Sequence, residues 1–180
     1  MLAHLMNTGL GPFYDGLLHL FVTPEDLLPV AALSLLAGLR GPAHGRVVLF
    51  SLPLAWLAGT ALGRALGPLG FLPIAAAVLT IALGGLVAAD RALSPRVVGG
   101  LAIALGLLHG AWNGGELASA RTGTLGTALG VATAIFVLVA LTAALVSSLR
   151  LPTARIVVRV AGSWIAAAAL FMLGWALRGA

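Results

Sequence analysis

The sequence has no cysteine, and only 8% of its 180 residues are charged. The absence of cysteine excludes a thiolate metal centre and a disulfide framework. The scarcity of charge stands beside 61% hydrophobic residues, whereas a soluble domain is about 45–50% apolar and about 25% charged. A mean hydropathy of +1.11 leaves too few polar side chains to cover a water-facing exterior. These values exclude a soluble globule and a disordered chain, and they predict a protein embedded in a lipid bilayer.

Lysine is also absent, so all ten basic residues are arginine, set against five acids. The arginines stand singly between apolar runs, without a basic stripe or interleaved aromatic residues, which argues against nucleic-acid binding. We interpret them as topology signals, because loops on the cytoplasmic side carry the excess of basic residues. Seven fall in the loops after the first, third and fifth expected helices, which predicts an integral protein of the bacterial inner (plasma) membrane with both termini outside. These seven are Arg40, Arg46, Arg91, Arg96, Arg150, Arg155 and Arg159, and the other three are Arg64, Arg121 and Arg178.

Long apolar runs bounded by Arg, Pro and Gly predict an all-α fold, a polytopic bundle of about six transmembrane helices in one domain spanning residues 1–180. Thr23-Pro24 and Ser94-Pro95 each place a hydroxyl at a helix N-cap and proline at the first helical position. Residues 11–22 are apolar but too short to cross the bilayer, so residues 1–23 are expected to form an interfacial or re-entrant segment. The expected helices cover residues 24–39, 47–66, 69–89, 95–117, 124–149 and 156–177.

Glycine is abundant, at 24 residues, and several glycines recur at intervals of four. In lipid, small residues at that spacing let helix backbones approach closely. Packing within the bundle is the main interpretation, and passage of a substrate along a glycine-lined seam is the alternative. The residues concerned are Gly59, Gly63 and Gly67; Gly106, Gly110 and Gly114; and Gly126 and Gly130.

Polar side chains are so few that those near membrane depth carry most of the functional information. A first cluster comprises Asp15, His19, Glu25 and Asp26. Asp15 and His19 are four residues apart and would share a helix face, where the carboxylate can bind a metal beside the imidazole or orient it. The alternative is structural, because the stretch from Thr23 to Asp26 resembles a capping box, with acids in the first helical turn.

A second cluster comprises His109, Asn113 and Glu116, which lie within roughly 60° of one another on a helix. In lipid these side chains should face the bundle interior or a wet cavity. They form either a structural polar network or a metal, proton or other cofactor site. The predicted topology puts both clusters at the outer ends of their helices, which favours one shared site. Imidazole, carboxylate and amide groups suit nickel, cobalt, zinc or copper.

At these two motifs the sequence resembles the HupE/UreJ family, small membrane proteins regarded as nickel or cobalt permeases that supply hydrogenase and urease maturation. The first family motif has the form His-x5-Asp-His. His19 matches its first histidine, and Glu25 and Asp26 occupy the place of Asp-His. The resemblance extends through the six-helix plan over most of the chain.

The second family motif has the form His-Gly-x-x-x-His-Gly-x-Glu or a shortened version of it. The stretch HGAWNGGE matches at His109, Gly110, Gly114 and Glu116, with Asn113 where a second histidine is common. With Asp26 and Asn113 at positions where the family has histidine, the expected site is richer in oxygen and poorer in nitrogen. Such a ligand set favours harder divalent ions more than the usual family motif does.

The resemblance implies a permease that takes up a divalent transition metal, nickel or cobalt first and zinc or copper as alternatives. Transport is expected to be passive, because the sequence has no ATP-binding motif. The expected partners are the lipid bilayer and the metal ion, together with a second copy of the chain or metalloenzyme maturation proteins. The expected metal ligands are His19, Asp15, Glu25, Asp26, His109, Asn113 and Glu116.

Two other classes of function remain open. The first is a non-transporting membrane subunit or scaffold that binds a partner protein or a haem held between His19 and His109. The second is an enzyme, which is not expected because Ser119 is the only hydroxyl nucleophile near His109 and no nucleophile elbow occurs.

Overall fold

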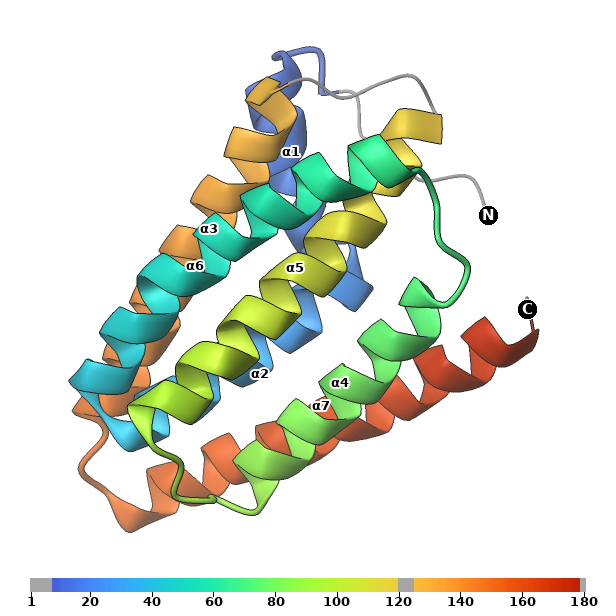
Figure 1. Ribbon diagram of the computed structural model, residues 1–180. Helices are drawn as coiled ribbons and strands as arrows, with labels where there is room; N and C mark the ends of the chain where they lie inside the picture. The colour runs from blue at the N-terminus through green and yellow to red at the C-terminus, as the bar shows by residue number, and fades with distance from the viewer. Residues whose placement is uncertain (1–7, 120–124, 179–180) are drawn as a thin grey trace.

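The computed structural model describes residues 8–119 and 125–178, and this part of the chain is helical without any strand (Figure 1). The all-α prediction is therefore confirmed. Arg121 and the expected helix start at Thr124 lie outside the described residues. The helices are α1 (Pro12–Val22), α2 (Pro24–Arg40), α3 (Pro42–Leu66), α4 (Leu72–Ala88), α5 (Pro95–Ser119), α6 (Leu125–Ser148) and α7 (Pro152–Arg178).

Proline sets most of the helix starts, because its fixed φ suits the first helical turn and its missing N–H is not needed there. The predicted starts at Pro24 and Pro95 are confirmed, and the Val97 amide donates to Ser94 Oγ at 3.4 Å. The same preference explains two differences from the expected bounds. The second expected helix begins at Pro42 instead of residue 47, and the last begins at Pro152 instead of residue 156.

By length and composition, α3, α5, α6 and α7 can each cross a membrane. The pair α1 and α2 is bent by 75° at Thr23, so it forms either one broken span or a re-entrant loop. The remaining helix, α4, is apolar and has 17 residues, at the lower limit of about 17–25 for a span. The six expected spans thus correspond to four long helices, one bent pair and one short helix.

The central helix of the bundle is α2, which contacts every other described helix. The other helices associate most closely in three pairs, α3 with α5, α4 with α7, and α1 with α6 (Figure 1). Near the middle of these helices, the interior is a layer of aliphatic side chains with no exposed surface. This apolar layer comprises Leu33 of α2, Leu52 of α3, Leu105 of α5 and Ile135 of α6.

Glycines bring the backbones of α3 and α5 into direct contact. A β-carbon added at Gly110 would collide with the carbonyl oxygen of Trp56, and one at Gly63 would collide with that of Ala111. The predicted role in bundle packing is therefore confirmed for these glycines, but it is wrong for Gly67, which ends α3 with a positive φ and has no neighbour within 4 Å of an added β-carbon. The alternative, passage along this seam, stays a prediction; in the structure, the backbone of the facing helix fills the space beside Gly63 and Gly110. Gly16 and Gly130 play the same part between α1 and α6.

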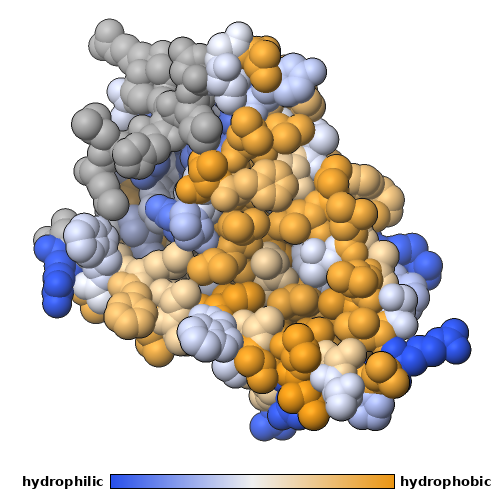
Figure 2. Space-filling model, turned by 180° about the vertical axis from the view of Figure 1, so that it is seen from behind, coloured by the Kyte–Doolittle hydropathy of each residue, from blue (hydrophilic) through white to orange (hydrophobic). Residues whose placement is uncertain are grey.

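The outer surface is apolar, as a lipid-facing surface requires. Figure 2 shows one face dominated by hydrophobic side chains, with strongly hydrophilic ones at its margins and in a small area in its upper part. On α7, Phe171 and Trp164 are 84% and 73% exposed.

The seven arginines of the predicted inner loops gather at one end of the bundle, which we call the arginine-rich end. There the Asp90 carboxylate pairs with Arg40 and Arg155, which joins α2 and α7 to the connection between α4 and α5.

Candidate functional site

Four polar side chains from three helices form one hydrogen-bonded network at the end of the bundle opposite the arginine-rich end. They are His19 of α1, Asp26 of α2, and His109 and Asn113 of α5. The two clusters singled out in the sequence are therefore in direct contact, although about 90 positions separate them. The bend at Thr23 makes this possible, because it lets α1 turn back over the start of α2 and bring His19 to Asp26.

Asp26 is the centre of this network, and 1% of its surface is exposed. Its Oδ1 accepts a hydrogen bond from His109 Nδ1 at 2.9 Å, and its Oδ2 accepts one from Asn113 Nδ2 at 2.9 Å. His19 Nε2 lies 3.4 Å from the same Oδ2. A buried carboxylate is costly unless donors surround it; His109 and Asn113 supply one each, and the edge of the His19 ring lies close to Oδ2.

The hydrogen bonds assign the tautomer of each imidazole. His19 Nε2 donates to Asn113 Oδ1 at 3.0 Å, which leaves His19 Nδ1 to accept from Thr23 Oγ1 at 3.4 Å. His109 donates through Nδ1, so its Nε2 carries a lone pair. That Nε2 is buried and has no hydrogen-bond partner within the described residues. It is the one atom of the network that is left unsatisfied, and such an atom requires an explanation.

The close approach of α3 and α5 fixes the position of the His109 ring. The indole of Trp56 stacks on it, with ring centroids 5.5 Å apart and an interplanar angle of 27°. The ring of Trp112 lies on another side, with centroids 6.1 Å apart. Since Gly110 is adjacent to His109 and touches the Trp56 backbone, the glycine contact holds the stacking partner in place.

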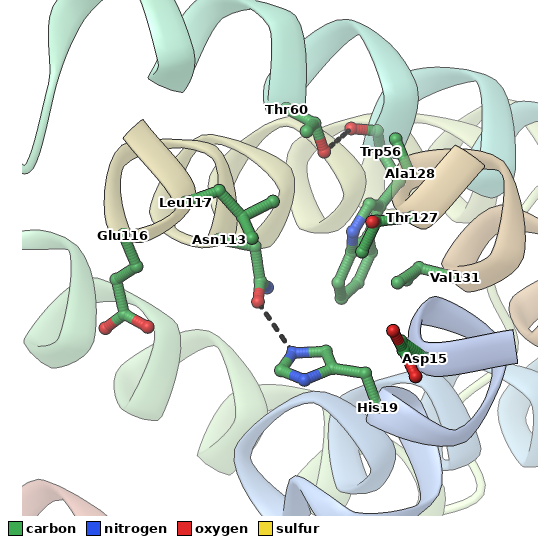
Figure 3. A pocket seen from close by; sticks show the side chains of 10 residues that line it. All are labelled: Asp15, His19, Trp56, Thr60, Asn113, Glu116, Leu117, Thr127, Ala128 and Val131. Atoms are coloured by element: carbon green, nitrogen blue, oxygen red, sulfur yellow. Dashed lines mark hydrogen bonds between the residues drawn. The ribbon is translucent and has the colours of Figure 1, made fainter. Parts of the chain in front are cut away.

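A small cavity of about 40 Å3 opens beside the network. Its volume exceeds the roughly 10–15 Å3 that one water requires, so it has room for a small ion or a few waters. Figure 3 shows His19 and Asn113 pointing toward one another across it, with the Trp56 ring and Asp15 at its edge. The wall consists of Asp15, His19, Trp56, Thr60, Asn113, Glu116, Leu117, Thr127, Ala128 and Val131.

The other three predicted ligands stand outside the network. Asp15 lines the cavity, but its carboxylate accepts hydrogen bonds from the Thr8 amide at 2.7 Å and the Thr8 hydroxyl at 2.6 Å. Glu116 also lines the cavity and accepts a 2.8 Å hydrogen bond from Trp112 Nε1. Glu25 lines a different hollow, of about 350 Å3, between α2, α4, α5 and α7.

The capping-box interpretation of the first cluster is wrong. Thr23 does occupy the N-cap position of α2, but its side chain makes no capping hydrogen bond. Its hydroxyl lies instead beside His19, and Asp26 reaches across to α5. The reason is tertiary: Asp26 gains two strong donors from α5, whereas a capping box offers it only one backbone N–H.

Trp56 and Thr60 were not singled out in the sequence, yet both line the cavity. Thr60 Oγ1 donates to the Trp56 carbonyl at 2.9 Å, as serine and threonine do in apolar helices. The sequence pointed to these two residues only indirectly, through the neighbouring glycines. They lie beside Gly59 and Gly63, on the face that packs against the matching glycines of α5.

In the described residues, no three His, Cys, Asp or Glu side chains are placed to hold a metal ion. The network as it stands satisfies its own donors and acceptors, except at His109 Nε2. A buried carboxylate that holds the Nδ1–H of an imidazole is nevertheless the usual outer partner of a metal-binding histidine, since it leaves Nε2 as the ligand atom. The donor set therefore fits a metal-binding role that requires the network to rearrange.

The comparisons with known proteins agree with the resemblance at the two motifs. Over residues 1–172, the sequence matches the family described as HupE / UreJ protein. No curated protein and no solved structure is found to match. Because the match covers nearly the whole chain, including both motifs that build the network, the protein belongs to the HupE/UreJ family of membrane accessory proteins associated with nickel and cobalt.

Proposed function

We propose that this protein is a membrane permease that takes up a divalent transition-metal ion, nickel or cobalt, through the network formed by His19, Asp26, His109 and Asn113. The observation that carries the proposal is the free Nε2 of His109, on a buried imidazole that the Asp26 carboxylate orients through Nδ1. The family supports the choice of cargo, since its members are associated with nickel and cobalt.

The side chains supply a mixed set of donor atoms for such an ion. Asp26 fixes the tautomer of His109, which keeps the Nε2 lone pair available. His19 Nδ1 is held only by a long contact of 3.4 Å with Thr23, so it can be released at small cost. Carboxylate and amide oxygens complete the set. A site with two imidazoles and no thiolate binds nickel or cobalt less tightly than a closed thiolate site, which suits uptake followed by release.

The geometry does not favour the haem-binding alternative. Both imidazoles contact the same carboxylate, His109 at 2.9 Å and His19 at 3.4 Å. Asp26 therefore stands between the two rings, where the macrocycle of a bis-histidine haem would lie. The adjoining cavity, at about 40 Å3, is also too small for a porphyrin, because pockets for ligands of that size measure roughly 300–1,000 Å3.

Replacing His109 with alanine is expected to weaken Ni²⁺ or Co²⁺ binding by at least about tenfold, because it removes the one unsatisfied nitrogen at the site. The measurement is isothermal titration calorimetry of the purified protein in detergent. His44→Ala is the matched control, since this histidine lies at the arginine-rich end and bonds the Leu93 carbonyl at 3.0 Å. The control should bind the metal as the wild type does.

Transport is tested with the same variants in proteoliposomes that contain a metal-sensitive dye. The wild type and His44→Ala should admit the ion, and His109→Ala should not. Equal metal affinity in the wild type and His109→Ala would contradict the site. If the wild type binds the metal but does not admit it, the metal-binding site is supported and the proposed permease activity is contradicted.

A further inference from the structure

A second hollow lies on the lipid-facing surface, far from the metal network, at the arginine-rich end. It is a groove of about 480 Å3 between the start of α3 and the end of α6. Small side chains form it, since Gly45 and Ala143 bring the two helices together and the residues beside them are too small to fill the gap. Its size falls in the range of roughly 300–1,000 Å3 that is typical of small-molecule sites.

The groove has two chemically different ends. Toward the middle of the bundle its wall is aliphatic, formed by Leu49, Val139 and Ala140. At the arginine-rich end the wall includes Arg46, an exposed residue whose side chain makes no hydrogen bond or ion pair with the described residues. The arginines nearby differ in this respect, because Arg40 and Arg155 are paired with Asp90. Arg46 thus offers an uncompensated positive charge at the mouth of an apolar slot.

Two hydroxyl groups stand beside this charge. Ser147 Oγ donates to the Ala143 carbonyl at 2.6 Å, and Ser148 Oγ donates to the Leu145 carbonyl at 2.7 Å. Ser147 Oγ also lies 3.3 Å from the Gly38 carbonyl. Since each hydroxyl hydrogen is already used, both oxygens keep lone pairs that can accept a hydrogen bond from a ligand. A ligand that complements this end carries a negative charge for Arg46 and hydroxyl donors for the serine oxygens.

We propose that this groove binds an anionic phospholipid with a glycerol headgroup. One acyl chain lies along Leu49 and Val139, the phosphate contacts Arg46, and the headgroup hydroxyls donate to Ser147 and Ser148. Basic pockets between membrane helices bind anionic headgroups in this way, through a guanidinium at the depth of the lipid phosphate. The proposal is independent of the metal network, because no residue is shared between the two sites.

The test is native mass spectrometry of the detergent-purified protein with added phosphatidylglycerol or phosphatidylcholine. The wild type should bind phosphatidylglycerol at least about tenfold more tightly than phosphatidylcholine, as a charge-assisted contact would give. Arg46→Gln should remove that preference. Arg96→Gln, an exposed arginine at the same end but outside the groove, should retain it. Ala144→Phe fills the groove from an exposed position and should lower the binding of both lipids.

Equal binding of the two lipids by the wild type, or equal loss of the preference in both arginine variants, would overturn the proposal. Full competition by glycerol phosphate would also overturn it, because the acyl chain would then contribute nothing. A wild-type dimer that Ala144→Phe converts to monomers would show that the groove is an interface between copies of the chain. Circular dichroism of each variant checks that the helices remain folded.

Discussion

Substituting alanine for Gly110 should destabilise the protein by about 3 kcal/mol or more, the upper part of the range for overpacking a tight interior. The added β-carbon would collide with the Trp56 carbonyl oxygen and lie 2.9 Å from the Thr60 amide nitrogen. Both neighbours are backbone atoms, so no side chain can rotate away and α3 and α5 must separate. The expected result is a large fall in the thermal unfolding temperature, followed by circular dichroism in detergent.

The same helix provides a matched control for this substitution. Gly100 is also in α5, but a β-carbon there would meet nothing within 4 Å. Gly100→Ala should therefore be neutral or slightly stabilising, because alanine costs less conformational entropy than glycine in a helix. Equal effects of the two substitutions would mean that α3 and α5 are not in backbone contact.

Replacing Asp26 with alanine should cost about 3–5 kcal/mol of stability and abolish metal binding. The substitution leaves His109 Nδ1 and Asn113 Nδ2 without their carboxylate acceptors in a buried site. It also frees the His109 ring to adopt either tautomer, so that Nε2 is no longer held ready as a ligand. Thermal unfolding measures the first effect, and Ni²⁺ or Co²⁺ calorimetry of the folded fraction measures the second.

Ser34→Ala is the control for the loss of a buried polar group from α2. Ser34 has no exposed surface, but within the described part of the chain its hydroxyl donates only to the Val30 carbonyl of its own helix, at 2.7 Å. Its removal should lower stability by about 1 kcal/mol at most and leave metal binding unchanged. If Asp26→Ala behaves as Ser34→Ala does, Asp26 is not the centre of the network.

Asp26→Asn separates charge from shape. The asparagine Oδ1 can still accept from His109, but its amide hydrogens would face the Asn113 amide hydrogens that now point at the carboxylate. Partial recovery of stability without recovery of metal binding is the expected result, since the shape returns and the negative charge does not.

Most of the fold followed from the sequence because apolar runs, proline and arginine act locally. The starts at Pro24 and Pro95 were predicted to the residue, since the proline signal lies at the helix end itself. The extra turns at the starts of α3 and α7 were missed because Arg46 and Arg155 interrupt the apolar run there, although each helix begins at an upstream proline.

The site was predictable in its members but less so in its contacts. Helical spacing predicted that His109 and Asn113 share one face of their helix. The distribution of arginines predicted the topology, and this topology put that face at the same membrane depth as Asp26. Spacing alone could not predict the 75° bend between α1 and α2, because the bend depends on the packing of α1 against α6 through Gly16 and Gly130. For the same reason, Trp56 could not be placed over His109 before the contact of α3 with α5 was known.

The apolar layer formed by Leu33, Leu52, Leu105 and Ile135 has an electrical consequence for the proposed transport. It lies between the metal network and the arginine-rich end, and its side chains are nonpolar with no exposed surface. Under the proposed function, such a layer insulates the two ends of the bundle, so part of the transmembrane voltage falls across it. A divalent ion that crosses the whole voltage changes in energy by about 4.6 kcal/mol per 100 mV, twice the value for a single charge. Under the proposed function, this layer makes the membrane potential itself the force that draws a captured cation inward.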